Sequence, residues 1–333
     1  MHDLVISLVT YNSEMYLQSC LESIFSQTFK DYELILFDNA SVDGTRNSIM
    51  RLAPHARRIF SEKNIGFAGA HNEVIRTTCS SYVCVLNPDL VLEPDYLERC
   101  IAECEMRPAL GSVTGLLIRV PALTGTAPRD TIDSYGLVVS KTGRAANAGE
   151  GVPVSALCAP RRIMGVPATA AVYRRSALDD SALDRSTVRD GSDTEYFDED
   201  FFMYKEDVDL ALRLRLRGWD ASAVLEARAY HVRSTSPALF KRPSPLINQW
   251  SYRNHFSILI KDVEARTWAR WGFLIVLYEL AKFFYLACFE RSTLTALADV
   301  WKNRKKMLAK RSSIMRRRTP PRTLTPPAEP DRA

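Results

Sequence analysis

The sequence lacks the cysteine patterns of a metal-bound or disulfide-stapled protein. The 333-residue chain has seven cysteines, an odd number, and no CxxC pair. Neither a zinc module nor a disulfide scaffold is therefore indicated. Cys100 and Cys104 share one face of a predicted helix without a further cysteine or histidine nearby, and we expect them to be core thiols. This cysteine usage is typical of a reducing cytosol.

Two glycine-rich nucleotide-binding sequences are also missing. Neither GxxxxGK[ST] nor GxGxxG occurs, which argues against a P-loop ATPase and a dinucleotide-binding fold. We expect no signal peptide, because apolar, strand-forming residues begin at Leu4 without a basic stretch or a cleavage site. Nine Lys or Arg lie between residues 302 and 318 with no aromatic residue among them. That pattern argues against specific nucleic-acid recognition.

The composition is that of a globular protein with a substantial core. Hydrophobic residues make up 46% of the chain and charged residues 25%, which are ordinary fractions. The length fits two domain-sized units or one large α/β unit with additions. The net charge of +5 is unevenly spread, since the basic run at 302–318 contrasts with nine Asp or Glu between residues 190 and 209.

Strand-like and helix-like segments alternate in the N-terminal third. Apolar runs at 4–9, 32–37, 59–60 and 82–86 are separated by helical patterns, which predicts βαβ units and a parallel sheet. Polar clusters follow three of these strands: Thr10-Tyr11-Asn12, Asp38-Asn39 and Asn87-Pro88-Asp89. Ligands bind beyond the carboxyl ends of the strands in such sheets. We therefore predict a binding site at this edge.

Each polar cluster has a plausible chemical role. Asp38 can accept hydrogen bonds from a base or a ribose hydroxyl, and Asp89 suits Mg²⁺ or Mn²⁺ held together with substrate phosphates. The glycine-containing segment 66–70 is predicted to be a loop that approaches a ligand, with Asn72 at the start of the next helix. The alternative is ordinary turn chemistry, because Asp, Asn, Pro and Gly are common in any α/β loop.

The segment 197–219, FDEDFFMYKEDVDLALRLRLRGW, is a carboxylate-rich loop that leads into an amphipathic helix. Leu210, Ala211 and Leu214 form its buried face, and Gly218 is a stop signal. The acidic residues of the first turn, where the helix dipole favours anions, are Glu206, Asp207 and Asp209. A carboxylate held there can serve as a general base. The alternative interpretation is simple helix capping.

Taken in order, the motifs VTYN, DNASVDGT, NIGFAGAHN, NPD and FFMYKEDVDLALRLRLRGW resemble those of family 2 inverting glycosyltransferases. The resemblance is strongest to the rhamnosyltransferase-like branch that builds bacterial lipid-linked glycans, and it extends from about residue 3 to about residue 260. It implies an α/β protein with the GT-A fold, in which helices flank a mostly parallel sheet. It also implies a nucleotide-diphosphate-sugar donor, a divalent metal (Mg²⁺ or Mn²⁺) and a lipid-linked or glycan acceptor.

The resemblance also implies roles for individual residues. The donor-binding set consists of Thr10, Tyr11 and Asp38 at the nucleoside, Asn64 and Asn72 along the donor, and Asn87 near the ribose. Asp89 and His231 are the implied metal ligands, and Asp207 is the implied catalytic base, with Glu206 and Asp209 in support. Arg253 and Asn254 resemble an acceptor-side feature. An arginine there could bind a diphosphate or form a surface salt bridge.

The chain also departs from the family pattern. A single aspartate in NPD replaces the double aspartate, so metal binding is expected to depend on the donor. Thr169 stands where relatives have a glycine and is expected to narrow the acceptor pocket. The acidic loop at 190–200 is predicted to be a solvated, mobile flap, with a lid over the donor as the alternative. Residues 119–165 are assigned to a small antiparallel insertion on the acceptor side.

The C-terminal part raises the question of a membrane. The segment 268–289 is long and apolar, but Arg270, Glu279 and Lys282 interrupt it, and a charge at the centre of a span costs roughly 2.5–3.5 kcal/mol. A helix lying on an anionic membrane surface, assisted by the basic run, fits better. The alternative is a helix packed on the catalytic domain. Beyond Thr319 the proline-rich tail is predicted to be disordered.

We therefore predict four parts: a nucleotide-sugar-binding half at 1–118, an acceptor-side and catalytic half at 119–262, amphipathic helices at 263–311 and a basic tail at 312–333. The predicted protein is a cytoplasmic glycosyltransferase, peripheral at the inner face of the plasma membrane, that moves a sugar to a lipid-linked or polysaccharide acceptor. L-Rhamnose from dTDP-rhamnose is the leading donor. The alternatives are another nucleotide-sugar enzyme, such as a nucleotidyltransferase, and a non-catalytic protein that binds through its basic tail.

Overall fold

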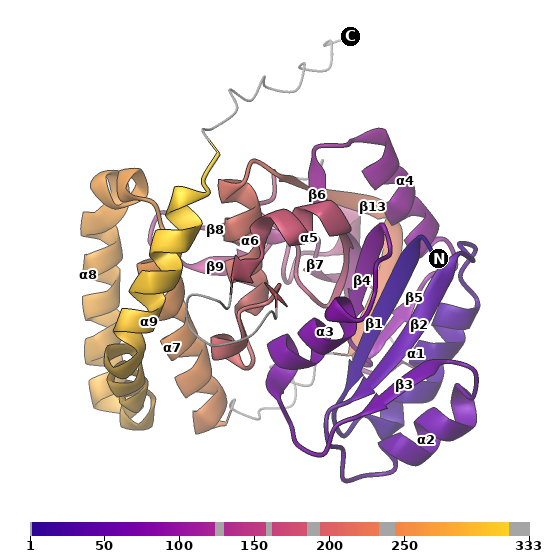
Figure 1. The fold of residues 1–333 in the computed structure, drawn as a ribbon. Helices are drawn as coiled ribbons and strands as arrows, with labels where there is room; N and C mark the ends of the chain where they lie inside the picture. Colours follow the sequence, from indigo (N-terminus) through magenta and orange to yellow (C-terminus); the bar gives the residue numbers. More distant parts are fainter. Residues whose placement is uncertain (1, 124–129, 158–161, 185–193, 233–243, 320–333) are drawn as a thin grey trace.

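The computed structural model describes residues 2–123, 130–157, 162–184, 194–232 and 244–319. Figure 1 shows a twisted central sheet with helices on both faces and, at one side, a group of C-terminal helices. The first part of the predicted acidic loop, residues 190–193, and the predicted tail beyond Thr319 lie outside the described residues.

The N-terminal half alternates strands with helices. Its elements are β1 (Leu4–Thr10), α1 (Glu14–Phe25), β2 (Tyr32–Asp38), α2 (Thr45–Leu52), β3 (Arg57–Phe60), α3 (Gly66–Arg76) and β4 (Tyr82–Leu86). The strands β1, β2, β3 and β4 are mutually parallel, and Thr10 of β1 pairs with Asp38 of β2 in the register. The predicted βαβ units are therefore present, and their carboxyl ends meet at one edge.

The segment 66–70 is helical, so its prediction as a loop was wrong. Gly66 begins α3 with φ +79°, and a Cβ there would lie 2.4 Å from the carbonyl oxygen of Phe202. The N–H of Phe67 donates to that same oxygen at 2.7 Å. The small residues that follow let α3 pack closely on the sheet, because Ala68 and Ala70 are fully buried.

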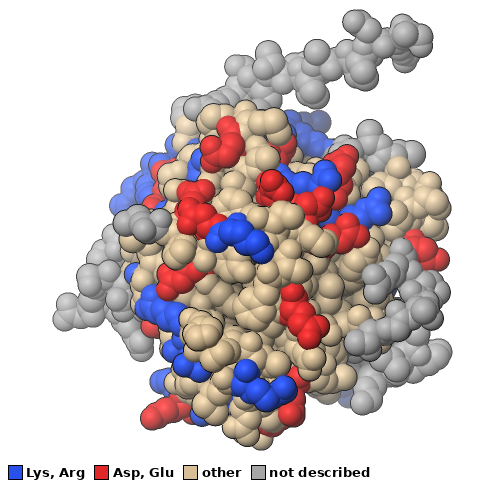
Figure 2. Space-filling view, turned by 90° about the vertical axis from the view of Figure 1, so that its right-hand side faces the viewer, with Lys and Arg blue, Asp and Glu red and all other residues tan. Residues whose placement is uncertain are grey.

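The face on the right of Figure 1, where α2 and β3 lie, mixes charges of both signs. Figure 2 shows acidic and basic side chains dispersed among uncharged residues on this face. Ion pairs include Arg57 with Glu33, 3.8 Å apart, and Arg46 with Asp38, 2.6 Å apart. A nucleic-acid backbone is bound by clustered Lys and Arg, and the described residues of this face form no such cluster.

The remaining strands make the sheet mixed. They are β5 (Leu90–Leu92), β6 (Leu110–Val120), β10 (Ala170–Arg174) and β13 (Asp220–Val232), accompanied by α4 (Tyr96–Met106), α5 (Arg175–Ser181) and α6 (Glu206–Leu216). The strand order is β3-β2-β1-β4-β10-β6-β13-β5, with β10 antiparallel to both neighbours and β13 parallel to β6. The antiparallel β10 therefore joins the parallel N-terminal strands to a second half that carries α6.

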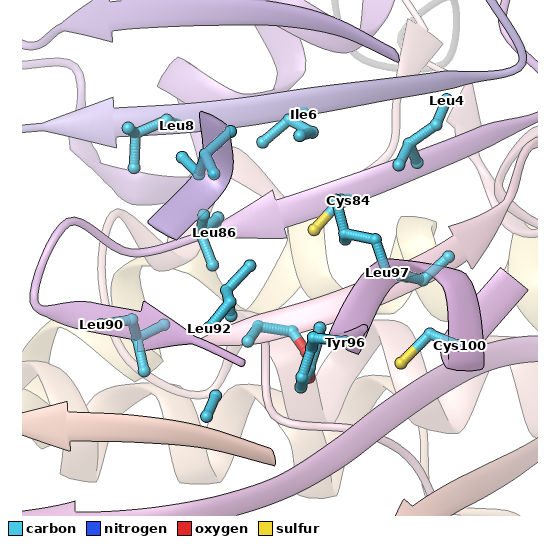
Figure 3. Close-up of a cluster of buried hydrophobic side chains, with 14 of the residues drawn as sticks. Leu4, Ile6, Leu8, Cys84, Leu86, Leu90, Leu92, Tyr96, Leu97 and Cys100 are labelled. Atoms are coloured by element: carbon cyan, nitrogen blue, oxygen red, sulfur yellow. The ribbon is translucent and has the colours of Figure 1, made fainter. Parts of the chain in front are cut away.

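A large apolar core lies between the sheet and α1 and α4. Figure 3 shows side chains of β1, β4, β5 and α4 converging there, including Ile6, Leu86 and Tyr96. The hydroxyl of buried Tyr96 donates to the carbonyl of Ala170 at 2.6 Å, which ties α4 to β10. Cys100 and Cys104 are buried in this core, as predicted.

The region predicted as an antiparallel insertion contains short antiparallel strands. These are β7 (Thr131–Ser134), β8 (Leu137–Val139) and β9 (Ala145–Asn147). β7 pairs with β6, and β8 pairs with β9 as a hairpin. The hairpin contacts the C-terminal helices through Lys141, whose ammonium lies 4.9 Å from the ring centre of Trp271.

The C-terminal helices are fastened to the catalytic half by a buried ionic cluster. They are α7 (Pro245–Lys261), α8 (Ala265–Phe289) and α9 (Ala296–Arg316), so α9 extends past the predicted start of the tail at residue 312. Lys310 of α9 donates to Asp198 at 2.6 Å and to Glu195 at 3.1 Å. Lys261 of α7 also pairs with Asp198.

The described part of the acidic loop is therefore not the solvated flap that its composition suggested. Glu195 and Asp198 are buried. Glu195 belongs to β12 (Thr194–Glu195), which pairs with β11 (Leu183–Asp184). The neutralising lysines stand more than 60 residues away along the chain, as for Lys261 with Asp198. Because a buried carboxylate needs a partner, the acidic loop and the basic C-terminal helices fold against each other.

Candidate active site

The carboxyl ends of β1 and β2 form a rim at which polar side chains are hydrogen-bonded to one another. The Thr10 hydroxyl lies 3.3 Å from an Asp38 carboxylate oxygen. Asp38 is fully buried and accepts hydrogen bonds from Arg46 Nε at 2.6 Å and from the Ser41 N–H at 3.1 Å. Tyr11 is 47% exposed at the same rim. The hydrogen bonds of Thr10 and Asp38 therefore hold the rim in one conformation. Contact of these two residues with a nucleoside stays a prediction.

A pair of asparagines joins this rim to α3. Asn39 donates to the side-chain oxygen of Asn64 at 3.0 Å and accepts from the Ile65 N–H at 2.8 Å. The same Asn64 oxygen accepts from the Gly66 N–H at 2.9 Å. Asn64 is half-buried at the start of α3. Sequence reasoning placed Asn39 in a turn cluster and missed that it bridges two strand ends.

Asn72 does not occupy the position predicted for it. It lies in the interior of α3 and is fully buried. Its amide nitrogen donates to the Phe197 carbonyl at 2.8 Å, and its oxygen accepts from the Phe197 N–H at 2.9 Å. Its side chain thus holds the segment before α6 instead of lining the donor path.

A cavity of about 370 Å³ brings together four of the predicted site residues: Asn87, Asp89, Asp207 and His231. They come from the end of β4, the following turn, the start of α6 and the end of β13. Thr169, predicted to narrow the acceptor pocket, also lines this cavity. Residues far apart in the sequence therefore meet at one hollow beside the strand ends.

Asp89 and His231 face each other in this cavity. The Nε2 atom of His231 lies 3.5 Å from Asp89 Oδ2, and its Nδ1 atom lies 2.8 Å from Asp133 Oδ2. Burial by itself lowers the pKa of His231, but hydrogen bonds to Asp133 and Asp89 and the charges of both carboxylates raise it to about 9. Asp133, which lies in the segment predicted only as an antiparallel insertion, thus orients the histidine. No local sequence signal pointed to it.

These residues fit a divalent cation that is shared with a substrate. Asp89 Oδ1 is buried and has no hydrogen-bond partner within the described part of the chain. The contact of His231 Nδ1 with Asp133 is the arrangement that aims the other ring nitrogen at a metal, and a cation bound there would displace the proton that the two carboxylates otherwise favour on Nε2. The described residues contain no group of three or more acidic, His or Cys side chains with metal-binding geometry. Two protein ligands plus phosphate oxygens suit Mg²⁺ or Mn²⁺.

Asp207 and Glu206 begin α6 and line the same cavity. The Val208 N–H donates to Asp207 Oδ1 at 2.8 Å. Burial raises the pKa of Asp207, although backbone hydrogen bonds oppose the shift. Burial and the neighbouring Asp207 charge raise the pKa of Glu206 to about 8. A carboxylate whose pKa moves toward neutrality is better suited to accept a proton.

The loop before α6 has an unusual backbone. Phe202, Tyr204 and Lys205 have φ of 62°, 71° and 67°, a region that costs of order 1–3 kcal/mol for residues other than glycine. Asn254 of α7 donates to the carbonyls of Phe201, Met203 and Tyr204 at 3.0, 2.9 and 2.8 Å. The loop that positions Asp207 is therefore strained and held by α7.

Arg253 and Asn254 were predicted on the acceptor side, and the structure gives them another task. Arg253 donates to the carbonyls of Asp200 and Phe201 at 3.0 and 2.9 Å. Asn254 is fully buried, and its amide is used by the loop. Neither residue lines the cavity that holds Asp207. Asn254 therefore holds the loop before α6, and its contact with an acceptor stays a prediction.

Residues 5–181 match the family model described as Glycosyl transferase family 2. The chain belongs to this family. The predicted family, the α/β GT-A fold and the glycosyltransferase class are confirmed. The match covers the strand-end rim and the Asp89 turn and ends before α6, so the roles of Asp207 and His231 rest on geometry and stay predictions.

Relatives of this glycosyltransferase act on bacterial glycans. It is 28% identical over 249 residues to the N-acetylglucosaminyl-diphospho-decaprenol L-rhamnosyltransferase of Mycobacterium tuberculosis, which covers 68% of this chain and 75% of that protein. It is 36% identical over 100 residues to the chondroitin synthase of Escherichia coli, covering 29% of this chain. The chain spans only 15% of the length of that synthase.

Two solved structures share the fold. Staphylococcus aureus TarS matches with a TM-score of 0.52 and 19% identity over 80% of this chain and 41% of TarS. GalNAc-T7, solved with UDP, GalNAc and Mn²⁺, matches with a TM-score of 0.57 and 12% identity over 78% of this chain and 49% of its own. At these identities the likeness establishes the fold alone.

Proposed function

We propose that this family 2 glycosyltransferase transfers a sugar, with inversion, from a nucleotide-diphosphate donor to a hydroxyl of a lipid-linked or polysaccharide acceptor in bacterial cell-envelope glycan synthesis. The observation that carries the proposal is the meeting of Asp207 with Asp89 and His231 at one cavity of about 370 Å³. Asp207 would supply a base, and Asp89 and His231 would supply ligands for a cation on the diphosphate.

In the proposed reaction, Asp207 accepts the proton of the acceptor hydroxyl. The hydroxyl oxygen bonds to the anomeric carbon of the sugar while the bond from that carbon to the diphosphate breaks, so the nucleoside diphosphate leaves with the electron pair. A divalent cation held by Asp89 and His231 would neutralise charge on the diphosphate. Asp207 is half-buried, and the rise in its pKa that burial causes supports its role as a base.

The leading donor remains dTDP-rhamnose. It is supported by the similarity to the L-rhamnosyltransferase of Mycobacterium tuberculosis, which aligns with 68% of this chain. The nucleoside would lie at the rim formed by Thr10, Tyr11 and Asp38, with Asn64 beside it and Asn87 toward the cavity. The acceptor would approach between Thr169 and Asp207.

The protein is proposed to work at the inner face of the plasma membrane. Within the described residues, α8 is the one helix long and apolar enough to cross a bilayer, and only 17% of its most apolar window is buried. Phe273, Phe284 and Phe289 are 79%, 64% and 76% exposed. So much exposed apolar surface does not fit a helix packed on the catalytic domain, and it supports a helix lying on a lipid surface.

The decisive experiment replaces Asp207 with asparagine. Asp207→Asn keeps the shape of the side chain and removes its basicity, so transfer from dTDP-rhamnose should fall by about 10²–10⁴-fold. Binding of dTDP, measured by calorimetry, should persist, because Asp207 belongs neither to the nucleoside rim nor to the proposed metal ligands. Asp95→Asn, at the partly exposed start of α4, is the matched control and should keep full activity.

Full transfer by Asp207→Asn would remove Asp207 from its role. The released product discriminates the reaction class as well. A glycosyltransferase releases dTDP, whereas a nucleotidyltransferase would exchange pyrophosphate. A panel of nucleotide-sugars in the same assay identifies the donor, and failure of dTDP-rhamnose with success of another donor would correct that choice alone.

A further inference from the structure

A second cavity adjoins the loop that leads into α6 and Asp207. It has a volume of about 310 Å³ and is enclosed by the β8–β9 hairpin, α6, α7 and α8. Its apolar walls include Val139, Val208, Leu212, Ile258, Trp271 and Ile275. Lys205 lines this cavity and the catalytic cavity as well. The two hollows therefore meet at one lysine, two residues before Asp207.

Three cations lie at this cavity or directly beside it. Lys141 and Lys205 line it, and Arg144 stands between the lining residues Gly143 and Ala145. Lys141 lies over the ring of Trp271 at 4.9 Å, and Arg144 lies over the ring of Tyr278 at 5.4 Å. Neither they nor Lys205 forms an ion pair with any residue that the structure describes. Glu279 is close: its Oε1 atom is 2.8 Å from His255, and its Oε2 atom has no hydrogen-bond partner in the described part of the chain.

The other cations of the cavity are already neutralised. Arg215 pairs with Asp220 at 2.6 Å. Arg266 and Arg318 pair with the same glutamate, Glu264, at 2.7 and 2.8 Å. Among the unpaired cations, Lys205 also lines the active-site cavity.

Lys205 and Arg144 are close enough to repel each other. Burial lowers the pKa of Lys205, and the charge of Arg144 lowers it further, against the opposing effect of Asp207 and Glu279. Two cations held together in a partly buried place are stabilised by an anion between them. A small anion without an apolar group would leave the adjoining apolar walls in contact with water, which is unfavourable.

We infer that this cavity binds the diphosphate and the first isoprenoid units of a lipid-linked acceptor, with Lys205 and Arg144 on the diphosphate and the chain against Leu212, Ile258 and Ile275. The inference rests on the proposed function, for which it names the acceptor class. The order of sugar, diphosphate and isoprenoid chain in such an acceptor agrees with the arrangement of the two cavities. The acceptor sugar would reach Asp207, the diphosphate would lie at Lys205 between the two cavities, and the chain would continue along α8.

The size of the cavity limits how much of the lipid it holds. About 310 Å³ is at the lower end of the range for ligand pockets, which is enough for the beginning of a chain only. The rest would pass to the exposed apolar side chains of α8. Trp271 and Ile275 belong to that helix, so the cavity wall and the proposed membrane-facing surface are continuous.

The test measures binding of farnesyl diphosphate to the full chain by tryptophan fluorescence, since Trp219 and Trp271 both line the cavity. Inorganic pyrophosphate and farnesol are titrated separately. Farnesyl diphosphate should bind at least about tenfold more tightly than either part, because only the whole molecule satisfies both the cations and the apolar walls.

Two variants locate the site. Leu212→Trp fills the cavity from a partly buried position of α6, and Arg144→Met removes the hairpin cation that is proposed to contact the diphosphate. Each should lower the affinity for farnesyl diphosphate by about tenfold or more, while the affinity for dTDP stays unchanged. Lys30→Met, an exposed lysine far from the cavity, is the control and should bind like the natural chain.

Equal affinity for farnesol and farnesyl diphosphate, or no effect of either cavity variant, would overturn the inference. Tight binding of pyrophosphate alone would also overturn it, because the site would then be a plain anion site. No sugar donor is present in this assay. Its outcome is therefore separate from the Asp207→Asn experiment, and either proposal can fail while the other stands.

Discussion

At the scale of single residues, the start of α6 places two carboxylates side by side in a buried position. Glu206 Oε2 has no hydrogen-bond partner within the described part of the chain, and burial together with the charge of Asp207 raises the pKa of Glu206 to about 8. Glu206 is therefore protonated at neutral pH. A neutral Glu206 spares Asp207 the repulsion of a second charge, so that Asp207 can be the one ionised base.

This arrangement predicts a pH-dependent effect of Glu206→Gln on stability. An unfolded glutamate has a pKa of about 4.3, so between about pH 4.5 and pH 8 the folded protein holds a proton that the unfolded chain has lost. Its stability then falls as pH rises, by up to about 1.4 kcal/mol per pH unit and proton. Glutamine abolishes this loss. The charged or titratable neighbours are common to both proteins: Tyr173, Tyr204, Lys205, Asp207 and Asp209.

Urea unfolding at pH 5.5 and pH 8 checks this prediction. Glu206→Gln should gain at least about 1 kcal/mol over the natural chain between the two pH values. Glu226→Gln, an exposed position on β13, should show no such gain. Parallel pH profiles for Glu206→Gln and the natural chain would mean that Glu206 is ionised in the folded protein.

At the scale of elements, α7 determines the shape of the loop that leads into α6. Three residues of this loop have positive φ without being glycine, and such strain persists only where surrounding contacts impose it. Asn254 supplies three of these contacts with one amide nitrogen. Phe202 also packs on Trp250 of α7, with ring centres 5.1 Å apart. The position of Asp207 thus depends on a helix that does not line its cavity.

Asn254→Ala should therefore impair catalysis more than substrate binding. Loss of the three hydrogen bonds lets the loop relax, and a displacement of about 1 Å can cost about 10²-fold in rate. We expect kcat to fall by about 10- to 100-fold while the KM for the nucleotide-sugar changes less than threefold, measured below the melting temperature of the variant. Asn248→Ala on the same helix, where the amide instead reaches Glu290 at 2.6 Å, is the control. An unchanged kcat in Asn254→Ala would show that the loop keeps its shape without α7.

The same elements show what the sequence can and cannot predict. The strand ends at Thr10, Asp38 and Asn87 were predictable because continuous apolar runs stop there and polar residues follow. The acidic loop was not, because composition alone suggests solvation while Lys261 and Lys310 neutralise it from the distant C-terminal helices. Glycines suggested a loop at residue 66, whereas they allow α3 to approach Phe202 closely. Long-range pairing of this kind leaves no local pattern.

At the scale of the whole molecule, the C-terminal helices are bound to the catalytic half and carry the surface that we propose to face lipid. Lys261 and Lys310 bury their charges against Asp198, and removal of one partner from such a pair is strongly destabilising. A truncation after α7 would delete Lys310 and leave Glu195 and Asp198 short of a cation. A membrane test by truncation would therefore confuse lost anchoring with lost folding, and substitutions on the exposed face of α8 avoid this problem.

The last prediction concerns that face. A Phe273→Asp, Leu277→Asp, Phe284→Asp variant changes three side chains that are 79%, 53% and 64% exposed, so the fold should persist. The natural chain should float with vesicles that contain phosphatidylglycerol, and the variant should lose at least about 90% of this flotation, because both apolar burial and the approach to an anionic surface are opposed. Met15→Asp, Val42→Asp changes exposed apolar residues far from α8 and should float normally. Equal flotation of both variants would exclude α8 as the anchor, and resistance of the natural chain to carbonate extraction would show that α8 spans the bilayer instead of lying on it.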